Sequence, residues 1–300
     1  MEKSHNPLVS VVMPSYNSEA FIKESIESVI NQTFKDWELL IVDGHSKDAT
    51  QKIIQSYAET DGRIKLLSDE GKGIGPALHQ GCLAARGRYI ARLDSDDIAY
   101  PNRFEVQVKY LNTHPETDLI SCFSEYINNE GKSLGYKFQY SSRFVIKKDP
   151  SNIFHPGVMM RKKAYMKSGG YPPLKRAEDL FLWHRLLRCS DVKILEQPLV
   201  KYRLSEDSLS SSMSSYFRDN VNALWSVIAK KEVLTQSDFD YLNTFINDNI
   251  THDSPVANPV RKSEMLFVNT LRLLVPRLWA YKIFFVFKNL FGIFRFGINY

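Results

Sequence analysis

Three aspartates within four positions, in Leu93-Asp94-Ser95-Asp96-Asp97, have the clearest potential for chemistry in this chain. They follow an apolar run, Tyr89 to Leu93, that is typical of a buried strand. Clustered carboxylates repel one another, so a fold that keeps them together commonly neutralises them with a cation. Hard ions such as Mg²⁺ take a few carboxylate oxygens and complete their shell with phosphate oxygens. The spacing therefore predicts a metal-bound diphosphate at a strand end. A solvated acidic turn is the alternative interpretation.

The elements that must position these aspartates alternate between strand and helix signals over residues 7–125. Apolar runs predict strands at 8–13, 37–42, 64–67, 89–93 and 119–123, with helices beginning near Glu19, Asp48, Pro76 and Pro101. Such alternation predicts an α/β fold with a mainly parallel, doubly wound sheet and helices on both faces. In such sheets ligands bind beyond the carboxyl ends of the strands. We therefore expect the loops at 14–18, 43–48, 68–75 and 94–97 to meet in one crevice.

The pattern changes after residue 126. A hairpin turn is expected at 128–132, a strand at 153–160 that leads into a basic helix start, and an amphipathic helix at 180–187 opening with Glu178-Asp179. Beyond residue 215 the chain reads as helical, with a proline-bearing linker at 253–259.

Composition narrows the class of protein. A hydrophobic share of 43% and an aromatic share of 12% are those of a globular protein with a proper core. The three cysteines, Cys82, Cys122 and Cys189, are widely spaced and form no CxxC pair, so neither a disulfide framework nor a zinc site is expected. A formal charge of +5 gives no case for nucleic acid. The N-terminus leads into a strand without an apolar signal segment, so a cytoplasmic location is expected.

Four motifs occur in a fixed order along the chain: Val9 to Asn17, Ile41 to Asp48, Leu93 to Asp97, and Ala177-Glu178-Asp179-Leu180. Each is weak alone, but the ordered set closely resembles the inverting family 2 glycosyltransferases, of the bacterial surface-polysaccharide type. The likeness covers roughly residues 7–210. It implies a GT-A fold with a nucleotide-binding half at about 7–125 and an acceptor-side half at about 126–210, followed by a helical C-terminal region over 211–300.

The resemblance implies a nucleotide pocket built from the first two loops. Pro14, Tyr16 and Asn17 would line it, with Tyr16 stacked on a flat base. Asp43 would accept a hydrogen bond from a base N–H, and the imide of uracil makes UDP the natural expectation. Turn packing for Tyr16 and helix capping for Asp43 are the structural alternatives.

The acidic motif matches the DxD element of the family. The resemblance implies that Asp94 and Asp96 divide contacts with the ribose or sugar and with Mn²⁺ or Mg²⁺, and that Asp97 shares either role. The metal would neutralise the departing diphosphate as a Lewis acid.

Basic contacts to that diphosphate are harder to assign. The segment Glu70 to Ala77 is glycine-rich but follows the third strand, which argues against a dinucleotide-binding loop. Where the family often carries an Arg-Asn pair, this chain has Leu78-His79. Lys72 or Arg86 would then supply the charge, and Arg203 is a further candidate. Ser205 stands where the family commonly has a histidine, which puts a metal-ligand role for that loop in doubt.

The general base is expected at the start of the predicted helix. Acidic residues in a first helical turn are stabilised by the macrodipole, which is the structural interpretation. The functional interpretation is a carboxylate that takes the proton of an acceptor hydroxyl as it attacks the anomeric carbon. The resemblance favours Asp179, with Glu178 kept as the alternative. His155 matches a family position near the acceptor side, although a structural hydrogen-bonding role is the simpler reading of a lone histidine.

The stretch from Met265 to Tyr300 is aromatic and basic. No acidic residue follows Glu264, and the longest central apolar run, Ile283 to Phe287, is far shorter than the roughly 20 residues that span a bilayer. Aromatics with Lys and Arg fit an interfacial helix on an anionic membrane. A helix docked on the protein, or on a second copy of it in a homo-oligomer, is the alternative.

These observations predict a metal-dependent inverting glycosyltransferase. The donor would be a nucleotide-sugar, most naturally a UDP-sugar, and the acceptor a hydroxyl of a lipid-linked or lipopolysaccharide glycan. The enzyme would lie on the inner face of the cytoplasmic membrane. The alternatives are a non-catalytic nucleotide-sugar binder that keeps the fold, and a nucleotidyltransferase, which would need a glycine- and arginine-rich loop where this chain has Pro14-Ser15-Tyr16-Asn17.

Overall fold

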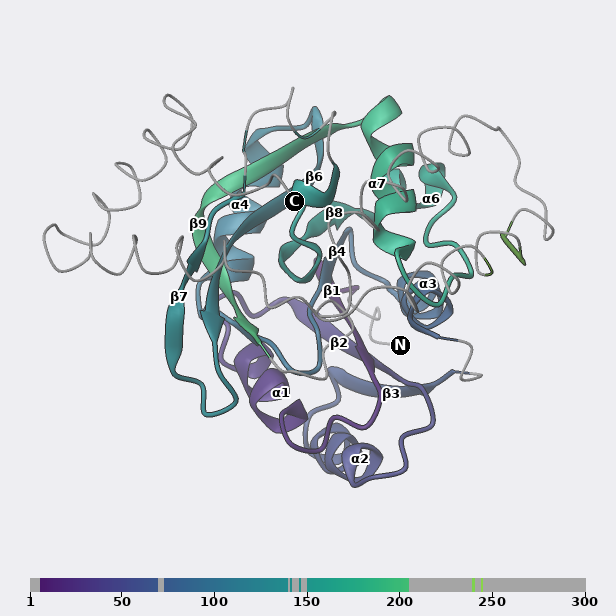
Figure 1. Ribbon diagram of the computed structural model, residues 1–300, viewed down its shortest axis with the longest axis vertical. Helices are drawn as coiled ribbons and strands as arrows, with labels where there is room; N and C mark the ends of the chain where they lie inside the picture. Colours follow the sequence, from purple (N-terminus) through teal and green to yellow (C-terminus); the bar gives the residue numbers. More distant parts are fainter. Residues whose placement is uncertain are drawn as a thin grey trace, which may run out of the picture.

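The computed structural model describes residues 6–69, 73–139, 141, 146, 150–204, 239–240 and 244. These residues form one nine-stranded mixed sheet with helices on both faces (Figure 1). The strands are β1 (Val9–Ser15), β2 (Trp37–Asp43), β3 (Ile64–Ser68), β4 (Tyr89–Arg92), β5 (Ile98–Ala99), β6 (Thr117–Ile127), β7 (Ser133–Lys137), β8 (Met159–Arg161) and β9 (Asp191–Arg203). The helices are α1 (Ile22–Ile30), α2 (Thr50–Thr60), α3 (Ile74–Ala84), α4 (Arg103–Thr113), α6 (Lys162–Ser168) and α7 (Glu178–Cys189), with 3₁₀ turns η1 (Pro150–Asn152) and η2 (His155–Gly157).

The strand order is β3-β2-β1-β4-β8-β6-β9-β5, with β7 paired to β6. The first four strands in this order are parallel, and β1 pairs with both β2 and β4. β8 then runs antiparallel to β4 and to β6, while β6 and β9 are parallel. The expected α/β class with helices on both faces is therefore confirmed. The expected parallel sheet is parallel over β3, β2, β1 and β4 and mixed beyond them.

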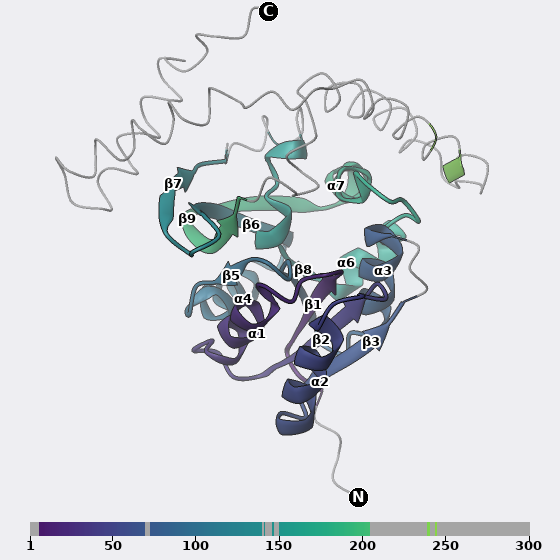
Figure 2. The same cartoon turned by 60° about the horizontal axis from the view of Figure 1, so that its bottom comes forward.

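The parallel strands β1, β2 and β4 are buried on both faces because their sequences are mostly apolar runs, whereas the edge strand β3 is only partly buried. Every residue of β1 and of β2 is buried. Alternate side chains feed two cores, with Val12 facing one and Val11 the other. The first core is closed by α3, α6 and α7, and the second by α1, α2 and α4. Figures 1 and 2 show these two helix groups on opposite sides of the sheet.

In the first half, α1 and α4 begin slightly later than the motifs predict, and α3 begins slightly earlier, at Ile74 and not at Pro76. α1 begins at Ile22 and not near Glu19, and α4 at Arg103 and not at Pro101. Asp48 does accept a hydrogen bond from the backbone N–H of Thr50, 3.0 Å away, at the start of α2. The hairpin expected at 128–132 joins β6 to β7, and Gly131 adopts the positive φ of 75° that its turn requires.

One predicted element is wrong in type. The run 153–160 was expected to be a single strand, but His155-Pro156-Gly157 folds as the 3₁₀ turn η2 and only Met159–Arg161 joins the sheet. Proline at the second position of that turn lacks an N–H for strand pairing. β9, the long strand that pairs with β6 over ten register positions, gave no sequence signal. The expected 210/211 domain boundary, the helical region beyond 215 and the tail at 265–300 lie outside the described residues.

Candidate active site

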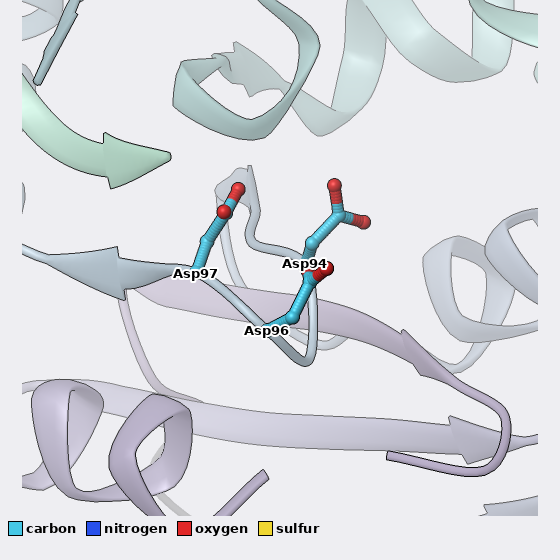
Figure 3. A group of neighbouring side chains, drawn as sticks. All are labelled: Asp94, Asp96 and Asp97. Atoms are coloured by element: carbon cyan, nitrogen blue, oxygen red, sulfur yellow. The ribbon is translucent and has the colours of Figure 1, made fainter. Parts of the chain in front are cut away.

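The acidic loop lies directly after β4, at the carboxyl end of the parallel strands. One carboxylate oxygen from each of Asp94, Asp96 and Asp97 lies within 4.8 Å of the others. Figure 3 shows the three side chains projecting from the same side of the loop. Ser95 ties the loop to its surroundings, because its hydroxyl pairs with that of Ser18 at 2.8 Å and its carbonyl accepts a hydrogen bond from Ser25 at 2.9 Å. The sequence prediction that these aspartates cluster is confirmed.

Burial and mutual repulsion raise the pKa values of two carboxyl groups in the cluster. Burial, together with the charge of Asp94, raises the pKa of Asp96 to about 6. Burial and the neighbouring charges of Asp96 and Asp94 raise the pKa of Asp97 well above its usual value. Oδ1 of Asp97 accepts a hydrogen bond from the backbone N–H of Arg203 at 2.9 Å, but its buried Oδ2 has no hydrogen-bond partner among the described residues. A group with this chemistry is a candidate ligand for a hard cation.

Arg92, which the sequence analysis did not select, is buried beside this loop. The last residue of β4, it forms an ion pair with Asp94. The side chain is only 5% exposed, and its Nε and Nη1 atoms have no hydrogen-bond partner within the described part of the chain. Its charge also acts on Asp97 and on Glu178. An arginine in an otherwise apolar strand was the available sequence signal, because a buried cation is costly unless it is paired with a buried anion.

Arg203, the last residue of β9, fastens the acidic loop from the other side. Its Nε donates to the carbonyl of Asp96 at 2.9 Å, and its two terminal nitrogens donate to the carbonyls of Asn128 and Asn129 and to the carboxylate of Glu24. The guanidinium has no exposed surface. These contacts favour a positioning role for Arg203 over the predicted contact with a diphosphate.

The predicted base pair opens helix α7. Ala177 precedes it in a left-handed conformation, with φ of 57°, which turns the chain sharply into the helix. The Glu178 side chain is 6% exposed and that of Asp179 is 26% exposed. Burial and the neighbouring Asp179 raise the pKa of Glu178 to about 8, and burial also raises the pKa of Asp179. Near neutral pH Glu178 therefore tends to be protonated, and Asp179 is the more accessible acceptor of a proton.

The acidic loop and the base pair belong to one electrostatic unit. The negative charge of Asp94 raises the pKa of both Glu178 and Asp179, and the positive charge of Arg92 lowers both. Such effects require proximity within the protein interior. His155 lies beside the base pair, with its Nδ1 3.8 Å from an oxygen of Glu178 and 3.8 Å from an oxygen of Asp179. The structure thus brings His155 to the predicted base pair.

The loops after β1 and β2 meet at the same sheet edge. Tyr16 is 61% exposed, so its aromatic ring is accessible for stacking on a flat ligand. Asn17 has a positive φ of 48°, receives a hydrogen bond from Lys47 N–H at 2.8 Å and donates its own N–H to the Ser46 hydroxyl at 2.9 Å. Pro14 lies within β1 opposite Val42 and is buried. Tyr16 is therefore the exposed residue of these two loops. Pro14 is part of the buried strand, and Asn17 joins the two loops through hydrogen bonds.

Asp43 ends β2 and is 1% exposed. Its two oxygens accept four hydrogen bonds, from the hydroxyls of Ser15 and Ser46, the N–H of Ser46 and the amide of Gln51. A carboxylate has about four acceptor positions, so the loop itself already occupies those of Asp43. These contacts favour loop organisation for Asp43, and its predicted contact with a base remains a prediction.

Lys72, the predicted phosphate contact, lies outside the described residues. Next to it, Gly73 has a φ of 107° and Gly75 donates its N–H to the carbonyl of Leu174 at 3.1 Å. A Cβ on Gly75 would lie 2.4 Å from the carbonyl oxygen of Pro172, so no larger residue fits there. The glycine-rich segment thus packs its backbone against the 172–174 segment that leads to the base pair.

A family model described as glycosyl transferase family 2 matches residues 10–169, more than half of the 300-residue chain. The chain belongs to glycosyl transferase family 2. A curated relative, the UDP-Glc:alpha-D-GlcNAc-diphosphoundecaprenol beta-1,3-glucosyltransferase WfgD of Escherichia coli, is 34% identical over 208 residues, which cover 68% of this chain and 80% of that protein. The protein is therefore a glycosyltransferase, and the non-catalytic and nucleotidyltransferase alternatives are set aside.

Two solved structures share the fold of this family 2 glycosyltransferase. TarS of S. aureus, residues 1–349 in complex with UDP-GlcNAc, has a TM-score of 0.60 at 19% identity and covers 88% of this chain and 79% of its own. The mannosyltransferase PcManGT of Pyrobaculum calidifontis, in complex with GDP-Man and Mn²⁺, has a TM-score of 0.57 at 15% identity and covers 96% and 88%. The expected GT-A type architecture is confirmed by these similarities.

The acidic loop of this glycosyltransferase fits a divalent cation on its own chemistry. Three hard carboxylate oxygens lie close together, and one of them, Asp97 Oδ2, is buried without a partner in the described structure. Mg²⁺ and Mn²⁺ prefer oxygen ligands and complete their shell with phosphate oxygens. Asp94, Asp96 and Asp97 are thus the residues that would hold such an ion.

Proposed function

We propose that this glycosyltransferase moves one sugar from a UDP-sugar to a hydroxyl of a lipid-linked glycan, with inversion at the anomeric carbon. The observation that carries the proposal is the placement of one acidic cluster and one partly exposed carboxylate, Asp179, around the buried cation Arg92. A site that binds a metal-diphosphate on one side and accepts a proton on the other has the two parts that sugar transfer needs.

The donor assignment rests on two supports. The E. coli relative is named for a UDP-glucose donor, and TarS was solved with UDP-GlcNAc. The exposed ring of Tyr16 at the sheet edge offers a stacking surface for a base. GDP is the nucleotide to test next, because PcManGT was solved with GDP-Man.

The chain's own residues supply the proton chemistry. Asp179 accepts the proton of the acceptor hydroxyl. At the same time the oxygen of that hydroxyl bonds to the anomeric carbon, and the bond from the anomeric carbon to the diphosphate breaks. Attack opposite the leaving group inverts the configuration. Glu178, held protonated near neutral pH by burial and by Asp179, leaves the base role to Asp179. Mg²⁺ or Mn²⁺ held by Asp94, Asp96 and Asp97 would neutralise charge that develops on the leaving diphosphate.

The acceptor and the location are further parts of the proposal. WfgD is named for a diphosphoundecaprenol-linked acceptor. Within the described residues, the structure contains no helix with the length and hydropathy to cross a membrane. The basic aromatic stretch at 265–300 would hold the enzyme on the inner face of the cytoplasmic membrane, as a C-terminal unit distinct from a catalytic domain at about 1–210.

An activity assay with Asp179→Asn tests this proposal. Wild-type enzyme is incubated with a panel of UDP-sugars and undecaprenol-diphosphate-linked acceptors, and transfer is followed by mass. We expect Asp179→Asn to lose about 10²- to 10⁴-fold in kcat, because the positioned base is gone, while UDP affinity changes little. Asp118→Asn is the matched control, since Asp118 is 27% exposed, against 26% for Asp179, and pairs with Arg161 outside the site. Full activity of Asp179→Asn would contradict the assignment.

A further inference from the structure

A buried chain of polar groups leads from helix α3 to the base pair. It runs through His79 on α3, Tyr165 on α6, Tyr171 and His155. Tyr165, Tyr171 and His155 are buried within a core that is otherwise mostly apolar. Buried polar networks of this kind are expensive to maintain unless every member is satisfied.

The last link of this chain joins Tyr171 to His155. The hydroxyl of Tyr171 lies 2.7 Å from Nε2 of His155, a short hydrogen bond. On the other side of the same ring, Nδ1 faces Glu178 and Asp179 at 3.8 Å each. Trp183 packs its ring against His155 in an edge-to-face arrangement, with centroids 5.5 Å apart, and limits the imidazole's freedom to turn.

The protonation of this pair follows from its surroundings. Burial and the charge of Arg92 lower the pKa of His155 well below its usual value, so the ring is neutral and carries one N–H. Burial raises the pKa of Tyr171, so the phenol keeps its proton. If the ring proton sat on Nε2, the lone pair of Nδ1 would face the negative charge of Asp179. The arrangement that avoids this repulsion has Tyr171 donating to Nε2 and the Nδ1–H directed at Asp179.

The backbone of Tyr171 is fixed by the rest of the network. Its N–H donates to the Tyr165 hydroxyl at 3.1 Å, and that hydroxyl pairs with His79 Nδ1 at 2.8 Å. Gly170 has a φ of 71°, and a Cβ there would lie 2.7 Å from the Tyr165 hydroxyl and 2.8 Å from His79 Nδ1. Only glycine fits that place. The network therefore anchors Tyr171 from two other elements, α3 and α6.

We propose that Tyr171 is a positioning residue for the sugar-transfer reaction, which holds His155 with its Nδ1–H directed at Asp179, and that this N–H orients the base. The inference rests on the proposed function, in which Asp179 is the base. At 3.8 Å the N–H is too far for a hydrogen bond, but such contacts commonly tighten once substrate is bound. His155 keeps its proton throughout, and the proton of the acceptor passes only to Asp179. His79 belongs to the Leu78-His79 pair that stands where the family often has Arg-Asn, and it supports this network.

The first test is Tyr171→Phe, which removes the hydroxyl and little else. We expect kcat to fall about tenfold, the typical effect of removing a group that orients a reactive side chain, with the KM for the UDP-sugar unchanged. Tyr89→Phe is the matched control, because Tyr89 is equally buried and its hydroxyl also donates to a side chain, Asn112, away from the site. Wild-type kcat in Tyr171→Phe would overturn the proposal.

The second test separates positioning from packing. In His155→Asn the amide can place an N–H near the position of Nδ1 but cannot reach Tyr171. In His155→Gln the amide can reach the Tyr171 hydroxyl in place of Nε2. We expect the kcat of His155→Asn to be at least about fivefold higher than that of His155→Gln. This difference is smaller than the full effect on activity of losing a group that orients a reactive side chain. The UDP affinity and the thermal midpoint show whether both variants are folded. If both are folded and His155→Gln has the higher kcat, a role for the Nδ1–H is contradicted.

The outcome also separates this inference from the proposed function. If wild-type enzyme transfers sugar and Asp179→Asn does not, the base assignment stands whatever Tyr171→Phe does. Unchanged kcat in Tyr171→Phe then removes only the positioning role. If Asp179→Asn keeps its activity, the proposed function fails first.

Discussion

At the scale of single residues, the acidic motif could be predicted from its spacing, whereas the base motif was predicted from the family resemblance. The aspartates after β4 are adjacent in the chain, so their clustering needed no long-range contact. The partners that tune them were not readable, since Arg92 and His155 reach Glu178 and Asp179 only through the fold. Asp43 and Arg203 show the same limit. The Ser15 hydroxyl that binds Asp43 lies 28 residues away in the sequence, and the Glu24 carboxylate that binds Arg203 lies 179 residues away, so neither contact could be predicted from local spacing.

The raised pKa values predict that stability falls as pH rises. Glu178 has a pKa near 4.5 when unfolded and about 8 when folded, so between these values the folded protein holds a proton that the unfolded chain has lost. The unfolding free energy contributed by that proton is fully present below about pH 4.5 and lost as pH rises through 8. We expect the thermal midpoint of metal-free protein to fall over this range.

Glu178→Gln supplies the check on this pH dependence, because an amide cannot titrate. Its thermal midpoint should fall less steeply from pH 5 to pH 8 than that of the wild type. Asp96 and Asp97 contribute in the same direction, whereas His155 and His79, whose pKa values are lowered by burial from 6.5, contribute in the opposite direction below that pH. The difference between the two slopes therefore isolates Glu178. A Glu178→Gln midpoint that falls as steeply as that of the wild type would contradict the assigned protonation of Glu178.

At the scale of elements, sequence patterns predicted the parallel strands β1 to β4 well and the later strands β8 and β9 poorly. β1, β2 and β4 are short, mostly apolar runs buried on both faces, which is the signal that periodicity reports best. β9 contains Lys193, Glu196, Pro198 and Lys201, so its composition argues against a central strand. It is held instead by its long pairing with β6. At 153–160, the His-Pro-Gly turn interrupts an otherwise strand-like run and places His155 beside α7.

Arg203 is the element-scale contact that we expect to matter most for the acidic loop. It joins β9 to that loop, to the β6–β7 turn and to α1. Arg203→Lys keeps the charge but loses the planar fork of donors. Leaving several buried carbonyls unpaired should lower the unfolding free energy by about 2 kcal/mol. Weaker Mn²⁺-dependent UDP binding should accompany that loss.

Chemical denaturation checks the Arg203 prediction. Arg63→Lys is the control, because Arg63 is 39% exposed and pairs with Asp61 at the surface, where ion pairs contribute little. Equal denaturation midpoints for Arg203→Lys and the wild type would show that the fork does not hold the loop.

At the scale of the whole molecule, the described residues contain the parts that the proposed reaction needs, and the 265–300 stretch is the expected means of reaching a membrane acceptor. That expectation rests on its charge and aromatic content alone. We expect the full chain to sediment with vesicles containing anionic lipid at low salt and to be released at 1 M salt, where the Debye length is about 3 Å. A chain ending at Pro259 should stay in the supernatant. A full chain that ignores anionic vesicles at low salt would contradict membrane binding.

The central claim is that the acidic loop binds a nucleotide diphosphate through a divalent cation. Calorimetric titration of UDP into the purified protein, first with Mn²⁺ and then with EDTA, tests it most directly. The account predicts binding with Mn²⁺ that EDTA removes and that Asp96→Ala abolishes. Binding of UDP that is equally tight in EDTA, or unchanged in Asp96→Ala, would contradict it.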